Sequence, residues 1–156
     1  MQMNNYAIIA QKMLESIFGS DIFILFAGIA TLVFMISTLL LANAIKRRTK
    51  EWEKNKNVQF SKFLLHGTSM FYTLFVTFIS IFPLLGMLGT VFGLLGLDLA
   101  SGDMENIKNN FFIALTSTAW GIIFSIIFKI FHAFISDNVD EQIETAKKLA
   151  EEIEKE

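Results

Sequence analysis

The chain has no cysteine among its 156 residues and only one proline. Without thiols it offers no disulfide framework and no thiolate metal site. Acidic residues are missing from three long stretches: between Asp21 and Glu51, between Glu53 and Asp98, and between Glu105 and Asp137. A protein that moves protons through a membrane usually needs an ionisable side chain at depth. The chain therefore either moves no protons or borrows that group from another subunit.

Apolar residues dominate what is present. The composition is 53% hydrophobic with 17 phenylalanines, which is too apolar for a soluble domain of this size. Three segments reach the roughly 20 residues that cross a bilayer, namely 21–45, 66–97 and 111–135. None alternates apolar and polar residues as a barrel strand does, so each must satisfy its backbone as a helix. The sequence predicts an all-α integral membrane protein with three transmembrane helices.

The basic residues are distributed unevenly and predict the topology. Seven cluster around the connection 46–65, and clusters of this kind stay in the cytoplasm; they are Lys46, Arg47, Arg48, Lys50, Lys54, Lys56 and Lys62. The N-terminus and the loop 98–110 then lie outside, and the C-terminus lies in the cytoplasm. Eleven of the 13 basic residues fall inside in this arrangement, leaving Lys12 and Lys108 outside. Lys129, near the inner end of the third span, is expected to extend to the cytoplasmic interface.

Each end of the chain carries a candidate amphipathic helix. Segment 1–20 is too polar for a signal peptide, so we expect no cleavage; it is either a short helix on the outer membrane surface or a frayed terminus. Segment 136–156 is expected to form a cytoplasmic helix capped by Ser136 or Asp137. Its apolar stripe follows a heptad-like spacing at Val139, Ile143, Ala146, Ala150 and Ile153. Two heptads leave open a solvated amphipathic helix or one that self-associates.

Small and hydroxylated residues are concentrated on the second and third spans. Gly86, Gly89, Gly93 and Gly96 recur every three or four residues, which places them on one helix face where another backbone can approach. The hydroxyls are candidates to line a polar path or to bond one turn back on their own helix; they are Thr73, Thr77, Ser80 and Thr90, and then Thr116, Ser117, Thr118 and Ser125.

Thr90 and Thr118 are the hydroxyls with the best geometric case for a shared site. Thr90 lies eight residues before Asp98, and Thr118 lies eight residues after Asn110, on antiparallel spans. Both therefore lie about 12 Å below the outer surface and are able to face one cavity. Pro83, in the middle of the second span, is expected either to kink that helix and free the carbonyl of Ile79 or simply to be tolerated.

Few residues suggest enzymatic chemistry. His66 and His132 both lie near the cytoplasmic boundary, and without carboxylate or cysteine neighbours they are weak evidence for a metal or a haem. No nucleophile with its base, no phosphate-binding loop and no basic nucleic-acid surface can be identified. We therefore expect a protein that is not an enzyme and has no cofactor and no metal.

Two stretches resemble the paired signatures of the MotA/TolQ/ExbB proton-channel family. The first is Pro83-Leu-Leu-Gly-Met-Leu-Gly-Thr-Val-Phe-Gly93 and the second is Ala114-Leu-Thr-Ser-Thr-Ala-Trp-Gly121. The family patterns, P-x-x-G-L-x-G-T-V-x-G and A-L-x-x-T-A-x-G, are matched at every fixed position except Met87, which stands where the family has leucine. The topology predicted from charge is also that of the three-span TolQ and ExbB branch.

The resemblance implies a homopentamer in a bacterial inner membrane, with its second and third helices around a central pore. In such a stator or energiser, two copies of a single-span partner resembling ExbD, TolR or MotB carry the membrane aspartate that the chain lacks. The ion gradient drives rotation or mechanical work on the partner, and the threonines matching Thr90 and Thr118 line the pore, with Thr116 and Ser117 nearby. Pro83, Gly86, Gly89, Gly93 and Gly121 would serve helix packing and the kink. The translocated ion is H⁺ or Na⁺.

The chain departs from the family at two places. The third span typically continues into A-I-P, whereas Ser125-Ile126-Ile127 occurs here without a proline. The connection 46–65 is also much shorter than the usual helical insertion, which argues against a flagellar role and favours a compact energiser. The alternative function is a non-conducting membrane scaffold that oligomerises through its glycine face.

Overall fold

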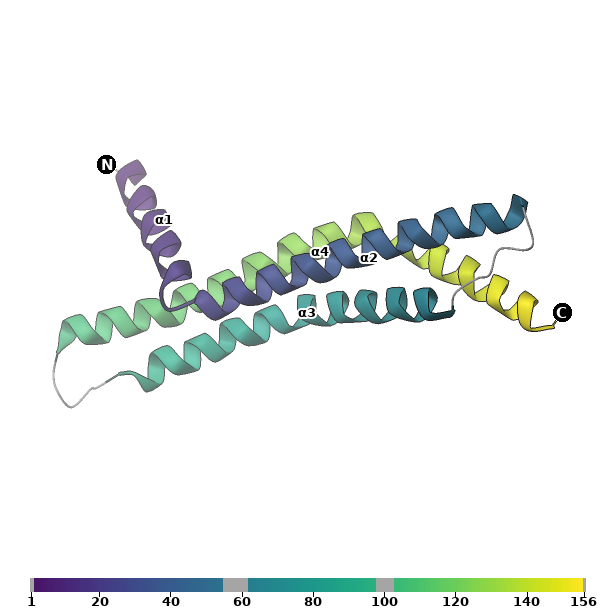
Figure 1. The fold of residues 1–156 in the computed structure, drawn as a ribbon. Helices are drawn as coiled ribbons and strands as arrows, with labels where there is room; N and C mark the ends of the chain where they lie inside the picture. The colour runs from purple at the N-terminus through teal and green to yellow at the C-terminus, as the bar shows by residue number, and fades with distance from the viewer. Residues whose placement is uncertain (1, 55–61, 98–102, 156) are drawn as a thin grey trace. The chain divides into compact units, whose positions relative to one another are not determined.

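The computed structural model describes residues 2–54, 62–97 and 103–155, and this part of the chain forms four helices (Figure 1). They are α1 (Gln2–Phe18), α2 (Ile22–Lys54), α3 (Lys62–Leu95) and α4 (Met104–Lys155). The all-α class is confirmed, and α2, α3 and α4 are each long and apolar enough to cross a membrane. Residues 55–61 of the predicted basic connection and 98–102 of the predicted outer loop lie outside the described residues.

The helices extend beyond the predicted spans. α2 continues through the basic cluster to Lys54, and α4 is one helix of 52 residues. Ser136 and Asp137 therefore lie inside α4 and do not cap a separate helix. The reason is that a residue suited to capping does not end a helix by itself, and no glycine or proline occurs after Gly121 to weaken it.

The N-terminal segment is helical and not frayed, since α1 ends only at Phe18. A tight turn follows it, in which the backbone amide of Gly19 (3.1 Å) and that of Asp21 (2.9 Å) both donate to the carbonyl of Ser16. The carbonyl of Asp21 then accepts the amide of Ile24 at 2.9 Å and starts α2. The position of α1 on a membrane surface stays a prediction.

The chain divides into two compact units, which are described separately. Residues 1–30 and 78–128 form the first, here called the glycine unit, and residues 31–77 and 129–156 form the second, here called the tail unit. Each of α2, α3 and α4 contributes residues to both units.

The tail unit has a small core of buried apolar side chains. Val139 and Ile143 of α4 are buried with Ala42 of α2, and Leu65 and Tyr72 of α3 pack against this cluster. Val139 and Ile143 of the tail's apolar stripe are therefore covered by the chain's own α2 and α3. The sequence had suggested a solvated helix or a self-associating one, and not this contact. The Ile153 side chain lies outside the described residues.

Many large apolar side chains remain exposed on the three long helices, among them Phe26, Leu40, Leu88, Phe92 and Ile126. A soluble monomer rarely exposes so much apolar surface. Such surfaces are expected where a helix faces lipid or other subunits.

Candidate functional site

In the glycine unit, the backbones of α3 and α4 touch each other. A Cβ atom added at Gly121 would lie 2.6 Å from the Phe82 carbonyl oxygen and 2.9 Å from the Gly86 Cα. A Cβ added at Gly93 would lie 2.8 Å from both the Ala114 nitrogen and the Asn110 carbonyl oxygen. Side chains at these positions would force the helices apart, so this contact depends on glycine.

The close contact brings Thr90 of α3 and Thr118 of α4 together, as their matched depth predicts. The two hydroxyls are hydrogen bonded to each other. Thr90 Oγ1 also lies 3.2 Å from the Gly86 carbonyl oxygen and 3.1 Å from that of Ala114, and Thr118 Oγ1 lies 3.4 Å from each of the same two oxygens. Both side chains are partly exposed. The result is a cluster of four oxygens, two hydroxyls and two carbonyls, which can solvate a passing cation or exchange hydrogen bonds with a partner.

The neighbouring hydroxyls Thr116 and Ser117 are used differently. Thr116 Oγ1 donates to the carbonyl of Ile113 on its own helix at 3.1 Å. Ser117 Oγ instead donates to Oδ1 of Asp21, a residue 96 positions earlier in the turn before α2. The Asp21 side chain is fully buried. Thr116 is therefore engaged within its own helix, while Ser117 binds a carboxyl group.

Sequence reasoning missed Asp21 as a site residue because it stands at the boundary of the first apolar run, where an acid ordinarily faces water. Gly89 leaves room for the Ser117 side chain that contacts Asp21. A Cβ at Gly89 would overlap the Ser117 side chain and lie 3.3 Å from the ring of Phe23. The only signal in the sequence was that Gly89 belongs to the same glycine face as Gly86 and Gly93.

Pro83 lies inside α3, where it has no N–H to donate to the carbonyl of Ile79 one turn earlier. Ser125 of α4 takes the place of that donor, since its buried Oγ donates to the Ile79 carbonyl oxygen at 3.3 Å. The carbonyl that the proline frees is thus satisfied across the helix contact. Ser125 begins the stretch in which the usual third-span proline is missing.

Aromatic side chains complete the packing of the glycine unit. The buried ring of Phe82 stacks on those of Phe124 and Phe128, with centroids 5.5 Å apart in both pairs. Trp120 Nε1 donates to the Met13 carbonyl oxygen at 3.0 Å, with Ser16 Oγ at 3.3 Å. This hydrogen bond attaches α1 to the α4 motif 114–121.

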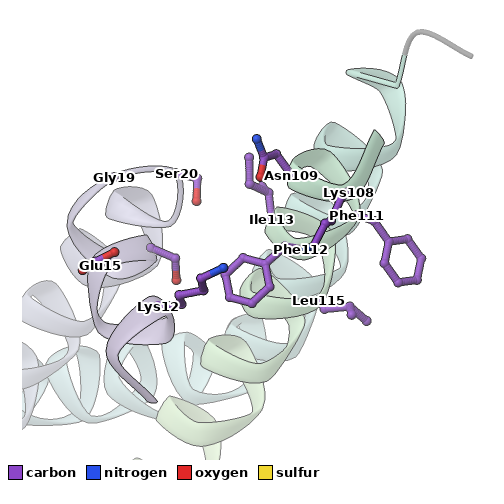
Figure 2. A pocket seen from close by; sticks show the side chains of 11 residues that line it. Lys12, Glu15, Gly19, Ser20, Lys108, Asn109, Phe111, Phe112, Ile113 and Leu115 are labelled. Atoms are coloured by element: carbon purple, nitrogen blue, oxygen red, sulfur yellow. The ribbon is translucent and has the colours of Figure 1, made fainter. Parts of the chain in front are cut away.

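A cavity of about 520 Å³ lies between α1 and the start of α4, also within the glycine unit (Figure 2). Its charged lining residues are Lys12 and Glu15 from α1 and Lys108 from α4. The Lys12 ammonium lies 5.8 Å from the centroid of the Phe112 ring, which is within cation–π distance. The cavity thus combines apolar walls with charges of both signs.

The two histidines have different surroundings. In the tail unit, His132 Nε2 is hydrogen bonded to the Tyr72 hydroxyl at 3.0 Å, and the two rings stack with centroids 5.7 Å apart. His66 is exposed. Among the residues that the structure describes, no group of three or more His, Cys, Asp or Glu side chains could hold a metal ion.

Three helices long and apolar enough to cross a membrane, two of which share a cluster of hydroxyls and carbonyls, define a multi-pass helical membrane protein. The model of the MotA/TolQ/ExbB proton channel family matches residues 64–148, which is more than half of the chain and includes both motifs. The chain therefore belongs to the MotA/TolQ/ExbB proton channel family, whose members are channel-type proteins that work with partner proteins in membrane complexes. No curated protein and no solved structure matches the chain significantly.

Proposed function

We propose that this chain is the channel subunit of a stator or energiser complex that couples inward ion flow to rotation or mechanical work on a partner protein. The observation that carries the proposal is the hydroxyl pair Thr90–Thr118, which lies at a backbone contact of two membrane helices inside the family-matching region. A pair that served packing alone would not need two partly exposed hydroxyls. An ion crossing the membrane needs oxygen atoms of this kind at depth.

The assembly in this proposal is a homopentamer with α3 and α4 around a central pore, occupied by two copies of a single-span partner that resembles ExbD, TolR or MotB and carries a membrane aspartate. The extensive exposed apolar surface supports burial against other subunits and lipid. The distribution of basic residues supports insertion in a bacterial inner membrane with the N-terminus outside and the C-terminus in the cytoplasm.

The ion path in this proposal centres on Thr90 and Thr118. Thr116 takes a smaller part than its sequence position suggested, because its hydroxyl is bonded to Ile113 of its own helix. Ser117 contributes through its contact with Asp21. Hydroxyl and carbonyl oxygens suit H⁺ and Na⁺ alike, so flux measured with and without sodium is the observation that separates the two ions.

Native mass spectrometry tests the assembly. The full chain is purified in a mild detergent, alone and after co-expression with a single-span membrane protein encoded beside it that carries a membrane aspartate. We expect five copies alone and two copies of the partner added to the five. A different number of copies, with no partner bound, would contradict the proposal. It would favour the non-conducting scaffold, for which the glycine contact alone would be sufficient.

Ion flux into vesicles containing the complex tests the path. Thr90→Val and Thr118→Val remove a hydroxyl while keeping the shape, and we expect each to reduce flux about tenfold or more, because a hydrogen bond to a charged group contributes about 1.5–3 kcal/mol. Thr77→Val is the matched control, since Thr77 Oγ1 bonds only one turn back, to the Thr73 carbonyl at 2.8 Å. Equal flux in all three variants, with assembly intact, would remove the hydroxyl pair from the path.

A further inference from the structure

Asp21 is a buried acid that has only part of its hydrogen-bonding capacity used. Its side chain is 0% exposed, and Oδ1 accepts the hydroxyl of Ser117. Oδ2 is buried and has no hydrogen-bond partner among the described residues. A buried carboxyl oxygen without a partner is rare in folded proteins and calls for a bound species that the chain itself does not supply.

No cationic side chain is described beside this carboxyl group, and the positive charge near it is the partial charge at the N-terminus of α2, which Asp21 precedes. Ser117, Gly89 and Phe23 meet one another beside it and are all neutral. The described charged side chains of the same unit are all exposed; on α1 they are Lys12 and Glu15, and on or just before α4 they are Asp103, Glu105 and Lys108. The described parts of α2 and α3 within this unit carry no charged side chain. The start of α2 offsets part of the cost of an ionised carboxylate, but a fully buried one without a paired cation is still costly.

A proton meets this requirement better than a metal ion does. Hard metal cations are held by several oxygen ligands, whereas the side-chain oxygens placed at this site are those of Asp21 and Ser117. No cluster of metal-ligating side chains occurs in the described part of the chain. A proton needs only one oxygen atom, and Oδ2 is available.

We propose that Asp21 and Ser117 form a proton-binding site that belongs to this chain. The carboxylate takes up one proton at Oδ2 to become the neutral acid and releases it again, while the Ser117 hydroxyl holds Oδ1 in place. Ser117 immediately precedes Thr118, so the site adjoins the hydroxyl pair along α4. The chain thereby carries an ionisable group of its own in addition to any acid that a partner brings.

Infrared spectroscopy of the full chain in lipid nanodiscs, without a partner, tests this site. Spectra of the wild type and of Asp21→Asn are recorded across a range of pH and subtracted. We expect a carbonyl stretch from a protonated carboxylic acid that fades reversibly as the pH rises, with the ratio of protonated to ionised acid falling about tenfold per pH unit. In Ser117→Ala this band should persist at a shifted frequency, because the hydrogen bond to Oδ1 is lost.

Glu15→Gln is the matched control, because Glu15 is an exposed acid of the same unit. The acid band assigned to Asp21 should be unchanged in this variant. If Asp21→Asn does not fold, labelling of the wild type by dicyclohexylcarbodiimide, which adds to buried protonated carboxyl groups, gives the same information, with the adduct located by peptide mass spectrometry. Carbodiimide adduct at Asp21 that declines with rising pH supports the site.

Two results would overturn the proposal. One is a carboxylate signal from Asp21 at every pH at which the chain is folded. The other is suppression of the acid band by sodium chloride but not by choline chloride at constant pH, which would assign the site to Na⁺. Because the measurement uses the chain alone, it can fail while pentamer, partner and ion flux are confirmed, or succeed while they are not.

Discussion

The glycine unit and the tail unit hold segments of the same three helices together by opposite means. In the glycine unit, α3 and α4 meet where side chains are absent, at Gly86, Gly93 and Gly121. In the tail unit, α4 meets its neighbours through buried apolar side chains, among them Val139 and Ile143. The first contact is intolerant of added volume, and the second is intolerant of lost volume.

The difference follows the solvent predicted around the α4 residues of each contact. Inside a bilayer, burying an apolar side chain gains little, because lipid is equally apolar, so close backbone packing and hydrogen bonds hold helices together. In water, removing apolar surface is the dominant favourable term. The glycine contact lies within the predicted spans, whereas Val139 and Ile143 belong to the predicted cytoplasmic segment 136–156. Ala42 and Tyr72, which they meet, lie toward the cytoplasmic ends of predicted spans.

The largest expected effect is that of Gly121→Ala. The added methyl group meets backbone atoms of Phe82 and Gly86 that cannot rotate away, and overpacking of this kind costs about 1–3 kcal/mol or more. Gly67→Ala is the control, because a Cβ there has nothing within 4 Å, and alanine in a helix is about 0.5–1 kcal/mol better than glycine. Thermal unfolding in detergent, followed by circular dichroism, measures both. Equal shifts in the melting temperature would contradict the assignment of the backbone contact.

Val139→Ala should produce the next largest effect, through lost volume. The side chain is fully buried in the tail unit, and its truncation removes apolar contact and leaves a cavity, for about 1–3 kcal/mol. Val33→Ala makes the same change at a side chain that is 53% exposed, and we expect little change there. The same unfolding experiment compares the two. If the exposed position were the more sensitive, the core of the tail unit would be misassigned.

Ser125→Ala should have the smallest effect of the three, about 1 kcal/mol, because it leaves the Ile79 carbonyl oxygen without its donor. The informative comparison is the same substitution in a Pro83→Ala background. Alanine in place of the proline restores an N–H that can bond to the Ile79 carbonyl, so the loss of the Ser125 hydroxyl should then cost much less. A double-mutant cycle measures this coupling. Strictly additive effects would show that Ser125 does not act as the substitute donor.

The sequence predicted the all-α class and three helices capable of crossing a membrane, because long apolar runs are strong local signals. It also predicted the meeting of Thr90 and Thr118, because helical rise and antiparallel spans give equal depths. Their role in an ion path stays a prediction. The sequence also predicted that one helix ends and another begins near Ser136. The structure instead has a single helix through this position, because a residue suited to capping does not by itself end a helix.

Other features depend on tertiary contacts that local patterns do not contain. The contact of Asp21 with Ser117 joins the turn after α1 to a residue 96 positions later, and Gly89 leaves space for the Ser117 side chain. The heptad stripe of the tail identified a buried face but not its partner. A pattern of this kind indicates which residues of a helix are buried. Which other helices cover them depends on the tertiary fold.

The bond between Trp120 and α1 also makes the molecule easy to observe. The chain has two tryptophans, and one lies in each unit, Trp52 in the tail unit and Trp120 in the glycine unit. Indole emission responds to its surroundings, so a Trp52→Phe chain would fluoresce from the glycine unit alone. Its emission maximum would shift when the hydrogen bond from the Trp120 indole to the Met13 carbonyl breaks. Detachment of α1 from α4 would therefore have an intrinsic fluorescence signal, without any attached dye.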